Sequence, residues 1–152
     1  MQTCDLLIKD GSLLIKYDQL EEHVDMAVSG GRILETGKEL WKKYQAVETI
    51  NGKGKLFMPG LIDSHMHTGQ QLLKGLVLDA KPIIWTRIML PFESTLTPEK
   101  MRLSAQAAAL EMIKSGTAGF IDAGSYFMED AAAVYETSGL RGALSYSTMD
   151  EE

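Results

Sequence analysis

The second part of the sequence alternates between apolar runs and amphipathic stretches of helical period, and this alternation constrains the fold most. The predicted elements are strands at 61–62, 118–121 and 142–146, with helices between them at 98–115 and 129–138. Strands that alternate with helices pair in parallel, because each helix returns the chain across one face of the sheet. Residues 59–152 therefore predict an α/β fold with a parallel sheet.

The helix predicted over 98–115 has clear signals at both ends. Thr97 is a favourable N-cap, Pro98 is tolerated in the first turn, and Gly116 can end the helix in a left-handed conformation. The residues expected on its apolar face follow the 3.6-residue period and are Met101, Ala105, Ala108, Ala109, Met112 and Ile113. The shorter helix is expected to have its apolar face at Ala131, Val134 and Tyr135.

The first part of the sequence contains short apolar bursts separated by turn-forming pairs. The bursts predict strands near 4–9, 12–16, 24–29, 32–36, 46–50 and 55–58. Asp10-Gly11 and Gly30-Gly31 are expected to form tight hairpins, because both pairs favour the positive φ of two-residue hairpin turns. One or two helical turns are expected within 38–44. Six short strands without a long helix predict half of a β-sandwich, so residues 1–58 are expected to form half of a composite domain.

Composition and charge exclude several classes of protein. The 15 basic and 21 acidic residues give a net charge of −6, which disfavours binding to nucleic acid or to an anionic membrane surface. No apolar run approaches the roughly 20 residues that a membrane helix needs. The single cysteine, Cys4, cannot form an intrachain disulfide or a thiolate metal site. We therefore expect a cytoplasmic protein in which nitrogen and oxygen atoms hold any metal.

Two histidines provide the main chemical signal. His65 and His67 are two residues apart at the end of a predicted strand, so their side chains leave the same face, and Asp63 is expected on that face too. Paired imidazoles favour a divalent metal, with zinc first and iron as an alternative, and the metal would lower the pKa of a bound water enough to form hydroxide. A catalytic zinc usually has about three protein ligands. The remaining histidine, His23, lies in the strand-rich part, far along the sequence from this pair. An alternative interpretation is that His65 and His67 are simply two polar residues at the boundary between a strand and a loop.

The residues around the histidines resemble a known family. The string at 58–67 reads MPGLIDSHMH, and it is similar to the opening of the amidohydrolase superfamily of metal-dependent hydrolases. The resemblance implies that this string forms the first strand of a TIM-like barrel. It also implies that His65 and His67 bind the catalytic metal at the mouth of the barrel, where the strands end.

Further segments are similar to the branch of this family that contains deaminases and chlorohydrolases. The segments that carry the resemblance are 72–75 (LLKG), Trp85, 90–97 (LPFESTLT), 115–122 (SGTAGFID) and 139–144 (GLRGAL). The last two segments resemble the second and third strands of the barrel. Their order along the chain makes the resemblance specific.

The resemblance and the positions of individual residues suggest further roles. The resemblance implies that Glu93 and Trp85 contact the substrate, although a solvated carboxylate and a core tryptophan are the plain alternatives. Gln70, close after the ligands, either contacts a heterocycle or faces solvent. Asp63 and Asp122 are candidates to orient the metal ligands, with a buried hydrogen bond for Asp63 and a turn cap for Asp122 as alternatives.

A complete barrel has eight strand–helix units in about 250 residues, and only three are predicted here. The later histidines and the aspartate on strand eight, to which the resemblance assigns proton transfer, are expected beyond residue 152. We therefore expect an incomplete barrel over 59–152, inactive alone, that either belongs to a longer enzyme or joins a complementing chain or a homo-oligomer.

The expected function is metal-dependent hydrolysis of a carbon–nitrogen or carbon–chlorine bond in a small heterocycle. Deaminases of adenosine thioethers commonly carry an arginine in the segment that here reads LSYS at 144–147, which favours neutral purines, pyrimidines or triazines over a homocysteine-type substrate. One alternative is a non-catalytic remnant or partner module. Another is a cyclic amidohydrolase, whose distinguishing bridging lysine would lie outside this chain.

Overall fold

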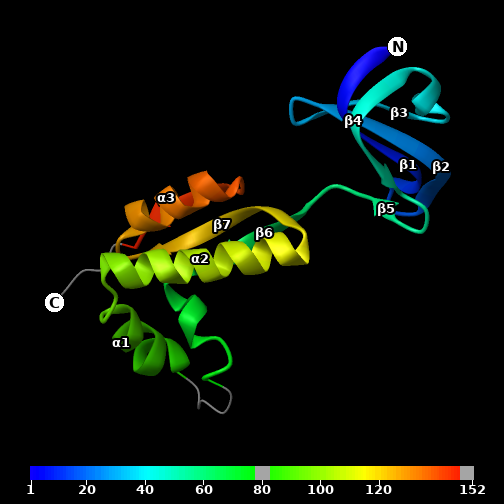
Figure 1. The fold of residues 1–152 in the computed structure, drawn as a ribbon. Coiled ribbons are helices and arrows are strands. Elements are labelled where there is room, and N and C mark those ends of the chain that lie inside the picture. Colours follow the sequence, from blue (N-terminus) through cyan, green and yellow to red (C-terminus); the bar gives the residue numbers. More distant parts are fainter. Residues whose placement is uncertain (78–82, 148–152) are drawn as a thin grey trace. The chain divides into compact units, whose positions relative to one another are not determined.

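The computed structural model describes residues 1–77 and 83–147. The chain divides into two compact units, which we call the strand unit (Met1–Pro59) and the α/β unit (Gly60–Glu152). In Figure 1 the first unit consists mainly of strands, whereas helices lie beside the sheet of the second unit. The division falls where the sequence pattern changes from short strands to alternating strands and helices.

The strand unit contains one five-stranded sheet with the order β3-β2-β1-β4, in which β5 also pairs with β1. β1 pairs antiparallel with β2 and parallel with β4 and β5, and β2 pairs antiparallel with β3. The strands are β1 (Gln2–Lys16), β2 (Gln19–Ser29), β3 (Arg32–Gly37), β4 (Tyr44–Asn51) and β5 (Leu56–Phe57). A short 3₁₀ turn, η1 (Leu40–Lys42), confirms the helical turn expected before β4.

The hairpin predicted at Asp10-Gly11 is wrong, because β1 continues through both residues. The pair forms an irregularity in the β1–β2 ladder, where the register shifts between Ile8 and Gly11. Asp10 has a positive φ of 61°, and its N–H donates to the buried Asp25 carboxylate at 2.9 Å, so the turn-forming pair bends a strand instead of ending it. The hairpin at Gly30-Gly31 is confirmed, since Ser29 pairs with Arg32 on either side of it.

The α/β unit contains a parallel three-stranded sheet with the order β6-β7-β8, as the alternating pattern predicted. Among the helices of the described residues, none combines the length and apolarity that a membrane crossing needs. The elements are β6 (Leu61–Met66), the 3₁₀ segment η2 (Thr68–Leu73), the π-helical turn η3 (Trp85–Met89), α1 (Leu90–Glu93), α2 (Pro98–Ser115), β7 (Thr117–Ser125), α3 (Met128–Ser138) and β8 (Arg141–Tyr146).

Both predicted ends of α2 are confirmed. The Thr97 side chain accepts a hydrogen bond from the Lys100 N–H at 3.3 Å, and Gly116 ends the helix with a φ of 82°. The predicted apolar face is buried except at Ile113, which is 52% exposed. Ser104 is buried on this face although its polarity gave no reason to expect it there.

The core of the α/β unit lies between its sheet and the helices α2 and α3, which run along the sheet in Figure 1. β7 shows how the two faces of the sheet differ, since Phe120 and Asp122 are buried and Ile121 between them is 51% exposed. We call the buried side the helix-covered face and the other side the open face. Ile62 of β6 is 67% exposed, so the open face carries accessible apolar side chains from two strands.

Candidate metal centre

The two histidines lie at the carboxyl end of β6, and their rings come together. The ring centroids of His65 and His67 are 5.0 Å apart, and the ring planes are nearly perpendicular at 81°. A spacing of two residues along a strand directs side chains to the same side, which accounts for this proximity. His65 is exposed, whereas His67 is half-buried and its Nδ1 atom is buried without a hydrogen-bond partner in the described part of the chain.

This geometry fits two ligands of one zinc ion. Zinc–nitrogen bonds of about 2.0–2.1 Å at a tetrahedral angle place the centroids of two ligating imidazoles about 5 Å apart. Within residues 1–77 and 83–147 the Nδ1 atom of His67 has no hydrogen-bond partner. No group of three or more metal-binding side chains occurs among the described residues, so the pair supplies only part of a zinc site.

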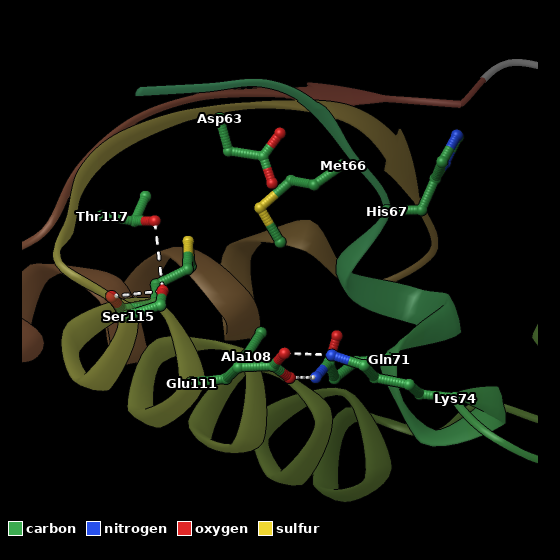
Figure 2. Close-up of a pocket in the computed structure, with 10 residues that line it drawn as sticks. Asp63, Met66, His67, Gln71, Lys74, Ala108, Glu111, Ser115 and Thr117 are labelled. Carbon is green, nitrogen blue, oxygen red and sulfur yellow. Dashed lines mark hydrogen bonds and ion pairs between the residues drawn. The ribbon is translucent and has the colours of Figure 1, made fainter. Parts of the chain in front are cut away.

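Asp63 does not share the face of the histidines, and this expectation is wrong. Figure 2 shows Asp63 and Met66 directed toward α2 while His67 points away from it. The β6–β7 register shifts between Asp63 and Met66, and this irregularity interrupts the simple alternation of faces. Asp63 is exposed, and its Oδ1 accepts a hydrogen bond from the His65 backbone N–H at 3.2 Å, so its described hydrogen bond to His65 is to the backbone and not to the ring.

Asp122 is 1% exposed and lies on the helix-covered face of β7, because it is two residues from the buried Phe120. Its Oδ1 accepts the Gly124 N–H at 2.8 Å, which is the turn cap considered as the alternative. Its Oδ2 accepts hydrogen bonds from both the backbone N–H and the hydroxyl of Thr68, the residue after His67. No imidazole is among its described hydrogen-bond partners, so the expectation of a direct bond to a ligand ring is not met.

Glu93 and Gln70 are brought together by the fold. The Glu93 carboxylate is 4% exposed, which rules out the solvated alternative in this structure. Its Oε1 accepts from Gln70 Nε2 at 2.6 Å, and its Oε2 accepts from Ser125 Oγ at 2.5 Å. A buried carboxylate from α1, a half-buried amide from η2 and a buried hydroxyl at the end of β7 therefore form one cluster. Ser125 could not be predicted from the sequence, since a lone serine after a glycine gives no signal.

Trp85 is 54% exposed at the start of η3, so it is not the core residue of the plain alternative. A pocket of about 200 Å³ lies between β6 and α2, and His67 contributes to its lining. Figure 2 shows that the imidazole of His67 points out of this pocket, while Gln71 and Lys74 reach Glu111 across its floor. The pocket is therefore distinct from the space between the two imidazoles.

Comparison with known protein families identifies the family of this chain. The profile of the amidohydrolase family matches residues 56–152. The chain belongs to the amidohydrolase family. The match contains β6 with both histidines and all the helices α1, α2 and α3.

The curated relatives of this amidohydrolase chain include deaminases. It is 34% identical to a 5′-deoxyadenosine deaminase of Methanobrevibacter smithii over 95% of this chain and 33% of the relative. It is 36% identical to a 5-methylthioadenosine/S-adenosylhomocysteine deaminase of Thermococcus onnurineus over 95% of this chain and 34% of the relative. The chain thus spans about a third of the length of the curated relatives that it matches.

Solved structures with the same fold include two zinc-bound proteins. An adenosine deaminase of Xanthomonas campestris with bound zinc matches 93% of this chain and 33% of its own, with 27% identity and a TM-score of 0.80. An atrazine chlorohydrolase of Arthrobacter aurescens TC1 complexed with zinc matches 95% of this chain and 36% of its own, with 21% identity and a TM-score of 0.80.

Proposed function

We propose that this chain is the amino-terminal part of a metal-dependent hydrolase that deaminates an amino-substituted heterocycle. The observation that carries the proposal is the pair of imidazoles, 5.0 Å apart at the carboxyl end of a parallel strand in an amidohydrolase-family chain. Active sites of barrel enzymes lie at this end of the strands. The family match and the names of the relatives support the same chemistry.

The proposed architecture is an incomplete barrel. The three parallel strands of the α/β unit would be the first three strands of the barrel. The barrel domain would begin at residue 59 of this chain and include residues 59–152. The open face, with exposed Ile62 and Ile121, would form part of the barrel interior once further strands close it. Residues 1–58 would form half of a sandwich domain.

The proposed roles divide between metal and substrate. His65 and His67 would hold zinc, which when bound would polarise a water molecule for attack. The buried Glu93, oriented by Gln70 and Ser125, would accept hydrogen bonds from substrate hydroxyls, and the exposed Trp85 would form an apolar wall. The residues that transfer protons are expected beyond residue 152.

The proposed substrate is a neutral purine-type heterocycle. A 5′-deoxyadenosine deaminase and a zinc-bound adenosine deaminase are among the relatives and structural matches. The residues at 144–147 offer no cation for a substrate carboxylate, which supports the neutral class.

The test is hydrolysis by the complete gene product that contains these 152 residues, loaded with zinc. Ammonia release is measured with 5′-deoxyadenosine and guanine, and chloride release with atrazine. We expect ammonia from a purine substrate and its loss in both His65→Asn and His67→Asn. His23→Asn, which changes an exposed histidine of the strand unit, is the matched control and retains activity.

Two results would contradict the proposal. Undiminished hydrolysis in the His65→Asn and His67→Asn proteins would show that these residues do not hold the metal. A zinc-free product without hydrolysis of any of the three compounds would instead favour a non-catalytic partner module.

A further inference from the structure

A closed hydrogen-bond network lies beneath the end of β6, on the helix-covered face. Its side chains are at most 3% exposed and belong to Thr68, Ser104, Asp122 and Tyr135. They come from η2, α2, β7 and α3, so the network joins every layer of the α/β unit. None of them has a chemical role in the proposed reaction. Buried polar groups are costly unless they are paired, so a complete network at this position requires an explanation.

Thr68 is the centre of the network, and each of its polar groups is satisfied. Its N–H donates to Asp122 Oδ2 at 3.0 Å, and its hydroxyl donates to the same oxygen. Since that hydroxyl hydrogen is used, the Tyr135 hydroxyl donates to Thr68 Oγ1, at a distance of 2.7 Å. The Thr68 carbonyl accepts from Ser104 Oγ at 2.6 Å.

Asp122 is itself fixed by the backbone around it. Its Oδ1 accepts the Gly124 N–H at 2.8 Å, and its carbonyl oxygen accepts from Ser145 Oγ of β8 at 3.1 Å. The carboxylate that anchors Thr68 is therefore held by a backbone N–H of its own strand, β7, while the backbone of Asp122 is bonded to β8. Thr68 cannot shift without breaking hydrogen bonds to β7, α2 and α3.

His67 precedes Thr68 and lacks an anchor of its own. Metal-binding histidines are usually oriented by a hydrogen bond from the second ring nitrogen. In His67 the Nδ1 atom has no partner in the described part of the chain, and the Asp122 carboxylate bonds to Thr68 and Gly124 and to no imidazole among the described residues. The orientation of the imidazole must then come from the backbone, which the Thr68 network holds.

We propose that Thr68, anchored by Asp122, Ser104 and Tyr135, is a positioning residue that directs the His67 imidazole toward the metal. The inference rests on the proposed function, because it requires His67 to be a metal ligand. It assigns to the hydroxyl of Thr68 the orienting task that a carboxylate on the ring usually performs.

The test is titration of the complete gene product that contains these 152 residues with Co²⁺, because the two histidines supply only part of the metal site. Binding is followed by visible absorption, and thermal unfolding of the same samples is measured. Thr68→Val has nearly the same shape but loses the hydroxyl, and we expect it to bind Co²⁺ about 10- to 100-fold more weakly, as for other residues that support metal ligands. Thr68→Ser keeps the hydroxyl and is expected to bind close to the wild-type affinity with the wild-type spectrum.

Tyr135→Phe is the milder variant, because it removes one donor and keeps both bonds from Thr68 to Asp122. We expect it to weaken Co²⁺ binding less than Thr68→Val does. Tyr126→Phe, at a tyrosine that is 42% exposed, is the matched control and leaves the affinity unchanged. If Thr68→Val does not fold, the Co²⁺ affinity of Tyr135→Phe tests the inference instead. An affinity equal to that of the Tyr126→Phe control overturns it.

Other outcomes separate the inference from the function on which it rests. A folded Thr68→Val protein with wild-type affinity, or equal losses in the Val and Ser variants, overturns the positioning role and leaves the metal site intact. A wild-type gene product that binds no Co²⁺, or binds it equally well after His65→Asn and His67→Asn, overturns the metal site and the positioning role together.

Discussion

The two faces of the β6-β7-β8 sheet differ in how complete they are. On the helix-covered face, Phe120 packs among side chains of α2 and α3, and every polar group of Thr68 has a partner. On the open face, Ile62 and Ile121 are more than half exposed. The imidazoles of the candidate metal pair have only each other as described ring neighbours. Within the described residues, the helix-covered face is therefore packed and fully hydrogen-bonded, whereas the open face exposes apolar side chains and the histidine pair has few neighbours.

Substitutions at adjacent positions of β7 should differ more in stability than any other pair considered below. Phe120→Ala should lower the free energy of unfolding by about 3–5 kcal/mol, because it leaves a cavity against α2 and α3. Ile121→Ala, one residue along and on the open face, should change it by about 0.5 kcal/mol or less. Urea unfolding of both variants measures the contrast. Equal losses would mean that the open face is covered in solution.

The second prediction concerns alkaline pH. Burial raises the pKa of Tyr135 to about 12, whereas a tyrosine in an unfolded chain titrates near 10. Between these values the folded protein keeps a proton that the unfolded chain releases, so the free energy of unfolding should fall as pH rises, by on the order of 2 kcal/mol. Denaturant unfolding from pH 9 to 12 should show a steeper decline in wild type than in Tyr135→Phe. Parallel declines would place Tyr135 outside the buried network.

A third prediction separates helix capping from packing on the helix-covered face. Thr97→Ala removes the side-chain acceptor for the Lys100 N–H and should cost about 1 kcal/mol of stability. Thr97→Ser retains the oxygen and should remain close to wild type. Thermal unfolding of the pair measures the capping contribution. If Thr97→Ala lost as much stability as Phe120→Ala, helix formation in α2 would contribute more to this face than the packing of its side chains does.

The smallest effect is expected on the open face. Ile62→Thr should leave the free energy of unfolding within about 0.5 kcal/mol of wild type, because the side chain is already 67% exposed. The same change should reduce self-association, since it removes apolar surface from an unpaired sheet face. Sedimentation and chemical denaturation test both expectations. A destabilisation comparable to that of a core residue would remove the distinction between the faces.

The sequence predicted the structure correctly where the relevant signal lies in neighbouring residues. The ends of α2 follow from Thr97 and Gly116, because capping depends on neighbouring residues. The proximity of His65 and His67 follows from strand alternation. Alternation failed one step earlier, at Asp63, because a register shift with β7 depends on another strand.

Long-range partners could not be read from the sequence. The bond between Thr68 and Asp122 joins residues 54 positions apart, and that between Ser125 and Glu93 joins residues 32 apart. Two weak signals were present in retrospect. Ser104 is a polar residue on an alanine-rich face, and Tyr135 is a buried hydroxyl that requires a partner. Neither signal names the partner.

The carboxyl end of β7 holds two anchors three residues apart. Asp122 fixes the segment after His67, and Ser125 fixes the carboxylate of Glu93. An insertion or deletion of one residue within this strand would displace both attachments in a single event. Evolution toward a new substrate would therefore have to preserve the length of β7 and vary side chains on η2 and α1.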